Sequence, residues 1–135
     1  MSTHTSVELN HTIVGVRDRE ESARFLAHVL GLEVGPASGP FLPVTTGNGV
    51  TLDFVTLPPH LDVTPQHYAF LVPEDAFDGI FARMTENGRD YWADPARRQP
   101  GQINHNDGGR GVYFLDPSGH YLEVITRPYG SGDDA

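Results

Sequence analysis

Two stretches of the sequence repeat one pattern: a short apolar strand that opens with histidine, an amphipathic helix, and a glycine that ends the helix. The first is HTIVGVRDREESARFLAHVLGLEVG, from His11, and the second is HYAFLVPEDAFDGIFARMTENGRDYWA, from His67. At 135 residues the chain has the size of a single domain. The two copies must therefore share one core.

The helix ends are marked in both copies. In the first, Asp18 and Glu21 have capping-box spacing, and Gly31 stands where a left-handed glycine ends a helix. In the second, Pro73 precedes the helix and Gly88 follows it. Each helix carries an apolar stripe, so each is expected to cover one face of a sheet.

Short strand-like runs follow each helix. They lie around residues 32–34, 41–45 and 50–56, and again around 90–93, 111–116 and 120–126. The chain is therefore predicted to be α+β, with two βαβββ modules at about residues 7–57 and 66–128 in one domain spanning residues 1–135. LPPHLDVTP would link the modules, and the tail YGSGDDA is expected to fray.

Composition excludes several kinds of chemistry and partner. The formal charge of -9 argues against nucleic acid or an anionic membrane and favours a small-molecule partner. All nine basic residues are arginine, which excludes lysine Schiff-base chemistry, and the lack of cysteine excludes thiol nucleophiles and thiolate metal sites. The sequence has no leader pattern and no apolar run of bilayer length, so it predicts a soluble, cytoplasmic protein.

Strand alternation predicts which side chains share a cavity, because successive residues of a strand face opposite sides of the sheet. If Val14 and its alternating neighbours cover a helix, His11 faces the other, concave side. The same count turns His67, Glu123 and Asp53 toward that side. Two histidines and two acids from four strands are therefore expected to face one cavity.

The DPSG turn sets the register of the last hairpin. Its proline and glycine favour a three-residue loop with a bulge, which pairs Asp116 with His120 and Tyr113 with Glu123. A two-residue loop would instead pair Tyr113 with Leu122 and turn the tyrosine to the opposite face. The turn chemistry predicts the first register, with Tyr113 on the cavity side.

Two histidines and one carboxylate that leave open positions on a metal are typical of non-haem Fe(II) oxygenases. A second carboxylate would suit a more closed site for Zn, Ni or Mn, with metal-bound water or enediolate chemistry. Asp53 decides between these two sites if it is a ligand. Its alternative role is to orient one of the histidines from behind.

With these residues in place, the chain resembles the vicinal oxygen chelate superfamily of glyoxalases, bleomycin- and fosfomycin-resistance proteins and type I extradiol dioxygenases. The resemblance covers about Val7 to Tyr129. It implies a curved mixed sheet around a metal held by His11, His67 and Glu123, with Asp53 at the position of an additional glyoxalase carboxylate. It also implies a homodimer, because small members of the superfamily usually associate.

The segment INHNDGGRGVYFLDPSGHYLE is similar to the extradiol ring-cleavage signature. That similarity implies an acid–base or oxygen-stabilising role for His105 and a hydrogen bond from Tyr113 to a substrate oxygen. The upstream His105 is the discriminating part, because the DPxG…E half is common to the whole superfamily. Ring-cleaving members usually carry no acid at the Asp53 position, and many are larger.

The expected function is Fe(II)-dependent dioxygenation of an aromatic or polyphenolic small molecule, with O2 as the second substrate. The alternatives are a glyoxalase-like lyase or isomerase that uses Zn, Ni or Mn, and a non-catalytic drug-binding resistance protein. The long connection YWADPARRQPGQINHNDGG is a candidate lid. The candidates for substrate contacts are Trp92, Tyr91, Phe41 and Arg98, with Arg97 beside them. His4, His28, His60 and His120 are given no role, and His120 is expected at an outward strand end.

Overall fold

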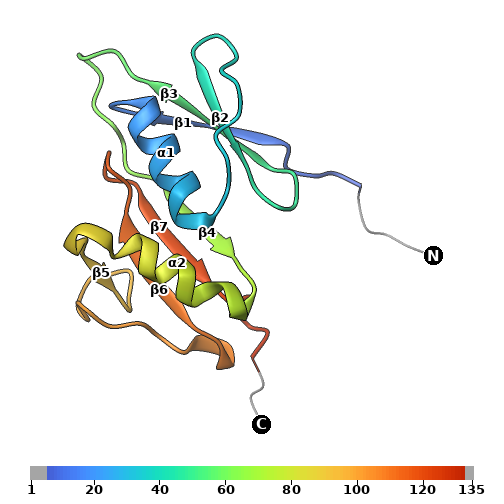
Figure 1. Cartoon of the computed structure of the whole chain (residues 1–135), viewed down its shortest axis with the longest axis vertical. Coiled ribbons are helices and arrows are strands. Elements are labelled where there is room, and N and C mark those ends of the chain that lie inside the picture. Colours follow the sequence, from blue (N-terminus) through green and yellow to red (C-terminus); the bar gives the residue numbers. More distant parts are fainter. Residues whose placement is uncertain (1–5, 133–135) are drawn as a thin grey trace.

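A computed structural model of the chain describes residues 6–132, which form two β-sheets and two α-helices (Figure 1). The first module contains β1 (His11–Val16), α1 (Arg19–Leu30), β2 (Phe41–Thr45) and β3 (Thr51–Thr56). The second contains β4 (His67–Leu71), α2 (Phe77–Met84), β5 (Tyr91–Trp92), β6 (Gly111–Leu115) and β7 (Tyr121–Ile125). Short 3-10 turns at Glu74–Ala76, Glu86–Gly88 and Asn106–Gly108 complete the second module.

The two sheets share one topology. Their strand orders are β1-β3-β2 and β4-β7-β6-β5, and in each sheet the first strand pairs in parallel with the last strand of its module. All other pairs are antiparallel. The predicted α+β class with two repeated modules is therefore confirmed.

The strand expected at residues 32–34 is reduced to a single bridge, in which Val34 pairs with Val44. Gly35 still donates its amide to the carbonyl of Pro43 at 2.9 Å. Pro36 follows and has no amide hydrogen, so the ladder cannot continue. The first sheet therefore has three full strands where the second has four.

Both helices pack on one shared core, as the repeat predicts. Asp18 caps α1 by accepting from the amides of Glu20 and Glu21, and Gly31 ends it with a φ of 72°. The two helices lie next to each other across the module boundary (Figure 1). Buried side chains of both modules form a single cluster, which includes Val16, Leu26, Phe54, Phe77, Phe114 and Val124. No helix within residues 6–132 combines the length and apolar character needed to cross a membrane.

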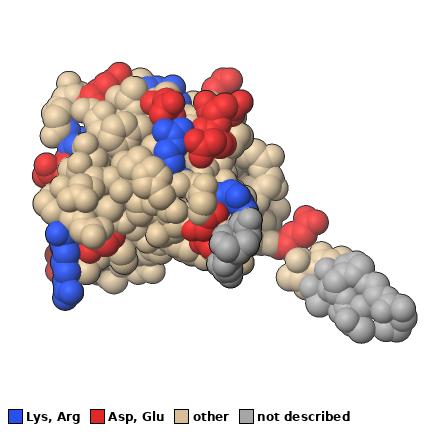
Figure 2. All heavy atoms as spheres, turned by 90° about the horizontal axis from the view of Figure 1, so that it is seen from below, with Lys and Arg blue, Asp and Glu red and all other residues tan. Residues whose placement is uncertain are grey.

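The arginines are mostly engaged in local contacts. Arg110 contacts Glu74 and Asp78, each at 2.6 Å, and its guanidinium lies over the ring of Phe77. Arg83 donates to the last carbonyls of α1, at His28 and Val29. On the face that Figure 2 shows, the basic side chains lie apart from one another and do not gather into one patch. These arginines therefore stabilise contacts between elements of the fold.

His120 is buried, with 2% of its surface exposed, so the expectation that it points outward is wrong. Its Nδ1 accepts from the Gln66 amide at 2.9 Å, so Nε2 carries the hydrogen and donates to the Gly15 carbonyl at 2.8 Å. The physical reason is alternation, because His120 lies two residues before the core residue Leu122. His28, by contrast, is on the helix surface near Glu86, and His60 is exposed; His4 lies outside the described residues.

His120 joins the end of the linker, the last hairpin and the first strand, so its loss should be costly. We expect His120→Ala to lower the free energy of unfolding by about 3 kcal/mol, because it leaves a cavity and two unpaired backbone groups. Urea denaturation of the metal-free protein at fixed chain concentration measures this. His28→Ala is the matched control and should change stability by less than about 0.5 kcal/mol. Equal effects of the two substitutions would contradict the bridging role.

Candidate metal centre

The predicted faces of the first sheet are confirmed by burial. Val14 and Val16 of β1, and Leu52 and Phe54 of β3, are buried toward the core. The alternate positions, which include His11, Ile13 and Asp53, face away from it, and the register places His11 beside Thr51 and Ile13 beside Asp53. His11 is exposed, and its Nδ1 lies 2.8 Å from the side-chain oxygen of Asn10. Asp53 is half-buried.

The last hairpin has the predicted register. The Asp116 amide donates to the His120 carbonyl at 3.0 Å, which closes the three-residue loop. Tyr113 consequently pairs with Glu123 across β6 and β7. Gly119 has a φ of 96°, a left-handed conformation that glycine adopts without strain. The turn therefore brings Tyr113 and Glu123 to one face.

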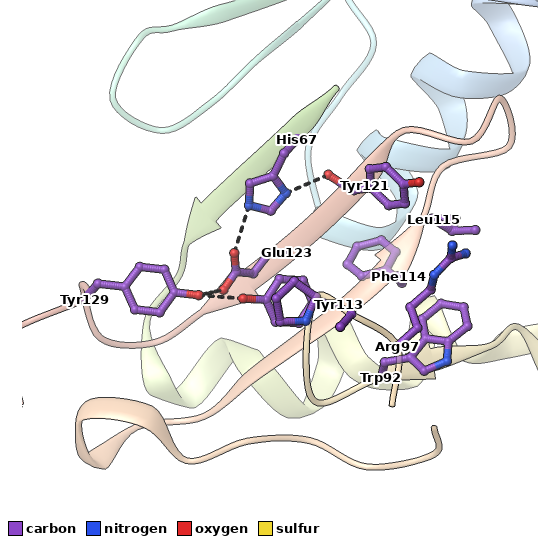
Figure 3. Close-up of a pocket in the computed structure, with 11 residues that line it drawn as sticks. His67, Trp92, Arg97, Tyr113, Phe114, Leu115, Tyr121, Glu123 and Tyr129 are labelled. Carbon is purple, nitrogen blue, oxygen red and sulfur yellow. Dashed lines mark hydrogen bonds and ion pairs between the residues drawn. The ribbon is translucent and has the colours of Figure 1, made fainter. Parts of the chain in front are cut away.

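His67 and Glu123 meet on that face (Figure 3). His67 Nε2 lies 3.0 Å from Glu123 Oε1, while its Nδ1 lies 3.1 Å from the carbonyl oxygen of Tyr121. Because Nδ1 must donate to that carbonyl, the neutral imidazole presents a lone pair at Nε2. A nitrogen lone pair and a carboxylate oxygen then point into the same space, as two ligand atoms of one metal would.

The Glu123 carboxylate is the most constrained group of the site. Its side chain is 0% exposed, and within residues 6–132 the side chain of His67 contacts it, with no arginine beside it. A buried carboxylate without a positive partner is costly. Two ligand atoms at right angles on one ion, each about 2.1 Å from it, would be about 3.0 Å apart. The donor set and its spacing therefore fit a divalent cation held by His67 and Glu123.

Two tyrosines extend the site. The Tyr129 hydroxyl donates to Glu123 Oε2, and the Tyr113 hydroxyl lies 2.8 Å from that of Tyr129. The Tyr113 ring also stacks on His67, with ring centroids 6.1 Å apart. Burial, and then the contacts with Tyr129 and Glu123, raise the pKa of Tyr113 well above its usual value. Tyr113 therefore keeps its proton and acts as a hydrogen-bond donor.

A cavity of about 500 Å³ opens beside these groups. Its walls are mostly apolar and aromatic, with Trp92, Phe114, Leu115 and Tyr121 next to the two tyrosines (Figure 3). This volume is in the range of sites for small organic molecules. The cavity can therefore hold a planar ligand against the edge of the His67–Glu123 pair.

One wall of the cavity comes from the loop after Trp92. Asp94 Oδ1 accepts from the amides of Arg98 and Gln99, at 2.9 and 2.8 Å, which folds this loop tightly. The fold gives Arg97 a φ of 60° and places its guanidinium 5.7 Å from the Trp92 ring and 5.6 Å from the Tyr121 ring. Part of the connection predicted as a lid therefore lies against the cavity.

The structure separates the four candidates for substrate contacts. Trp92 lines the cavity as predicted. Arg98 does not line it, and the residue before it, Arg97, does. Tyr91 packs edge-on against Phe81, with centroids 4.9 Å apart, on the core side of β5. Phe41 is on β2, in the other module. Strand alternation explains why Tyr91 faces the core, since its neighbour Trp92 faces the cavity. Residues 94–100 form a loop without periodicity, so the sequence does not predict which of its arginines lines the cavity.

The other candidate residues are not brought to this pair within one chain. His105 is exposed, at the start of the Asn106–Gly108 turn, and is not part of the cavity wall. His11 and Asp53 are on the first sheet, and residues 6–132 contain no cluster of three His, Cys, Asp or Glu side chains that could hold a metal. A single chain therefore presents the candidate centre in two parts.

Arg97, named beside the substrate candidates, lines the cavity, and so do Tyr121 and Tyr129, which are not predicted from the sequence. Tyr129 follows the last strand, in the tail expected to fray. Residues 129–132 of this tail are instead fixed by Asp107, whose Oδ1 accepts from the amides of Gly130 and Gly132 at 3.2 and 3.0 Å. The last three residues of the tail lie outside the described residues. Alternation could have found Tyr121, two residues before Glu123, but no local pattern marks the tail contact.

Comparisons with known proteins place the chain among relatives of known fold. The chain is 62% identical to a protein named oxidase ChaP-H2, with a TM-score of 0.92 over 96% of this chain and 100% of that one. It is 58% identical to oxidase ChaP-H1, with a TM-score of 0.87 over 93% and 99% of the two chains. Among curated proteins, it is 30% identical to the glutathione transferase FosA of Serratia marcescens, over 86% of this chain and 78% of that protein.

The model of one protein family matches residues 8–124, which include both sheets and all of the candidate ligands. This match agrees with the two repeated modules of the fold. The chain belongs to the Glyoxalase/Bleomycin resistance protein/Dioxygenase superfamily.

Proposed function

We propose that the protein is a metal-dependent enzyme, and specifically a non-haem Fe(II) oxygenase that acts on an aromatic or polyphenolic small molecule. The observation that carries the proposal is the buried Glu123 carboxylate, which has His67 Nε2 at 3.0 Å and, in the described part of the chain, no arginine to balance its charge. The names of the two relatives with the highest identities quoted above, both oxidases, favour redox chemistry over the other activities of the superfamily.

We propose further that His11 of a second copy completes the centre. His11 and Ile13 share the open face of β1, and His67 and Leu71 share that of β4. Ile13 is 56% and Leu71 60% exposed, although both are large apolar residues. A second copy placed on these faces by two-fold symmetry would cover them and would build two equal centres, each with His11 from one chain and His67 and Glu123 from the other.

The chain's own groups bind and orient the substrate in this proposal. When bound, iron(II) supplies redox chemistry with dioxygen and leaves positions open for substrate oxygens. Trp92, Phe114 and Leu115 would enclose a flat ring and exclude water. The Tyr113 hydroxyl has one hydrogen, which Tyr129 accepts in this structure, so the predicted hydrogen bond to a substrate oxygen requires that hydrogen to turn from Tyr129 to the substrate. His105 lies outside the cavity wall of the single chain, so its acid–base role stays a prediction.

A glyoxalase-like lyase or isomerase is the second candidate, and one observation favours it. Asp53 lies beside Ile13 on the same face as His11, so a copy that supplies His11 would bring this carboxylate close as well. A fourth protein ligand would suit Zn, Ni or Mn and chemistry without oxygen. Metal content and oxygen consumption therefore decide between the two candidates.

Protein purified without oxygen and reconstituted with Fe(II) should consume dioxygen when given catechols or hydroxylated polycyclic aromatics. We expect about one iron per centre and uptake that depends on the aromatic compound, because the open coordination positions must be filled by substrate and dioxygen. Glu123→Gln, which removes the charge at nearly constant size, should lose both the iron and the uptake. Turnover under strict anoxia with Zn or Ni bound would instead support the lyase.

Mixed dimers test whether the centre is shared. His11→Ala and Glu123→Gln homodimers should each lack metal. In a dimer of one His11→Ala chain and one Glu123→Gln chain, a shared arrangement leaves one centre undamaged, so about half of the metal content and activity should return. If each chain built its own centre, no metal would return, because every centre would carry one lesion.

The matched control combines His67→Ala with Glu123→Gln. Both lesions are in the second module, so each centre of this mixed dimer keeps one damaged ligand in either arrangement. It should show no recovery of metal. Recovery here would mean that chain mixing raises metal binding for an unrelated reason and would remove the support for a shared centre.

A further inference from the structure

We infer that Tyr129, from the segment after the last strand, is a positioning residue that holds Glu123 in the orientation in which it binds metal. The inference rests on the proposed metal centre. It assigns a role in that centre to a residue outside the two repeated modules. Tyr129 is outside both βαβββ repeats, which end with β7 at Ile125. It is also outside the 8–124 region matched by the family model.

The two oxygens of Glu123 have different partners. Oε2 accepts a hydrogen bond from the Tyr129 hydroxyl, and Oε1 lies 3.0 Å from His67 Nε2. The terminal torsion of a glutamate side chain is broad, so an unrestrained carboxylate rotates freely about it. With Oε2 fixed by a hydroxyl, the carboxylate presents Oε1 as a single ligand atom beside the imidazole.

The hydrogen bonds run in one direction through the two tyrosines. A tyrosine hydroxyl has one hydrogen, and Tyr129 directs it to Glu123. The Tyr129 oxygen must therefore accept the hydrogen of Tyr113, whose hydroxyl is 2.8 Å away. The order Tyr113 to Tyr129 to Glu123 connects the cavity wall to the carboxylate oxygen that is turned away from His67. Figure 3 shows this line of contacts.

The Tyr129 segment is itself fixed on the protein. Asp107 Oδ1 accepts from the amides of Gly130 and Gly132, and Arg127 donates to the Ser131 carbonyl at 2.8 Å. The approach of the two segments is close, since a Cβ added at Gly132 would lie 2.4 Å from the Asp107 Cα. The hydroxyl therefore belongs to an anchored turn, although the Tyr129 residue as a whole is 55% exposed.

A merely structural role makes the opposite prediction for metal affinity. If the hydroxyl only satisfied a buried carboxylate in the metal-free protein, its removal would destabilise that form and metal would bind more tightly. If the hydroxyl orients the ligand, its removal weakens metal binding. Tyr129→Phe distinguishes the two, because it removes the oxygen and retains the ring.

We expect Tyr129→Phe to weaken Mn(II) and Fe(II) binding by about 10- to 100-fold, the usual effect of losing a group that orients a metal ligand. Competition with a chromophoric chelator, on full-length dimeric protein, measures the affinity. The Mn(II) electron paramagnetic resonance spectrum should also change, because the freed carboxylate can coordinate through both oxygens. Unchanged or tighter Mn(II) binding in the variant would overturn the inference.

Two further variants sharpen the test. Tyr91→Phe removes a hydroxyl on the core side of β5, outside the cavity, one that forms no side-chain hydrogen bond within residues 6–132, so Mn(II) affinity should not change. Asp107→Gly keeps the backbone φ of 57° accessible and removes only the anchoring carboxylate. It should weaken Mn(II) binding less than Tyr129→Phe, and the double variant should be no weaker than Tyr129→Phe alone. Additive losses would contradict an anchor that acts through Tyr129.

Failure of this inference is distinguishable from failure of the proposed function. If wild-type protein binds no divalent metal at all, the metal centre itself is wrong. If wild-type protein binds metal, loses it on Glu123→Gln and keeps it fully on Tyr129→Phe, the centre stands and only the role of Tyr129 is wrong.

Discussion

The buried charge of Glu123 is the constraint on which the rest of the site depends. A carboxylate at 0% exposure in the middle of a sheet is tolerated only if its oxygens are satisfied. Here one oxygen faces a histidine and the other receives a tyrosine hydroxyl. The neighbouring apolar walls keep water away, which strengthens each of these interactions. In the proposed centre, a bound cation would balance the charge of the carboxylate.

The repeated modules explain why the Glu123 carboxylate lies on an open face of its sheet. Each module buries one face of its sheet under a helix and leaves the other face open, with a histidine at the start of its first strand. His120 fixes the two modules to each other from within, through Gln66 on one side and Gly15 on the other. These contacts fix the position of one open face relative to the other. His11 of the first module is therefore kept apart from His67 and Glu123 of the second.

Periodicity accounts for the parts of the fold and site that the sequence predicts. Alternation placed His11, His67, Glu123 and Asp53 on the faces opposite the core, and turn chemistry set the pairing of Tyr113 with Glu123. The failures lie where periodicity stops. Residues 94–100 are folded by hydrogen bonds within the loop, from the amides of Arg98 and Gln99 to Asp94. The Tyr129 segment is held by Asp107, from a separate loop. The prediction for His120 is wrong because this residue, although it precedes β7, keeps the alternation of that strand and is buried.

The distance between His11 and the His67–Glu123 pair has a consequence for how the protein responds to dilution. In the shared arrangement, metal binding and association of the two chains are coupled by mass action, since each ion would cross-link two chains. Dilution would then release the metal as the dimer dissociates, and added metal would shift the equilibrium back toward the dimer. Chain concentration would thus act as a control on metal loading.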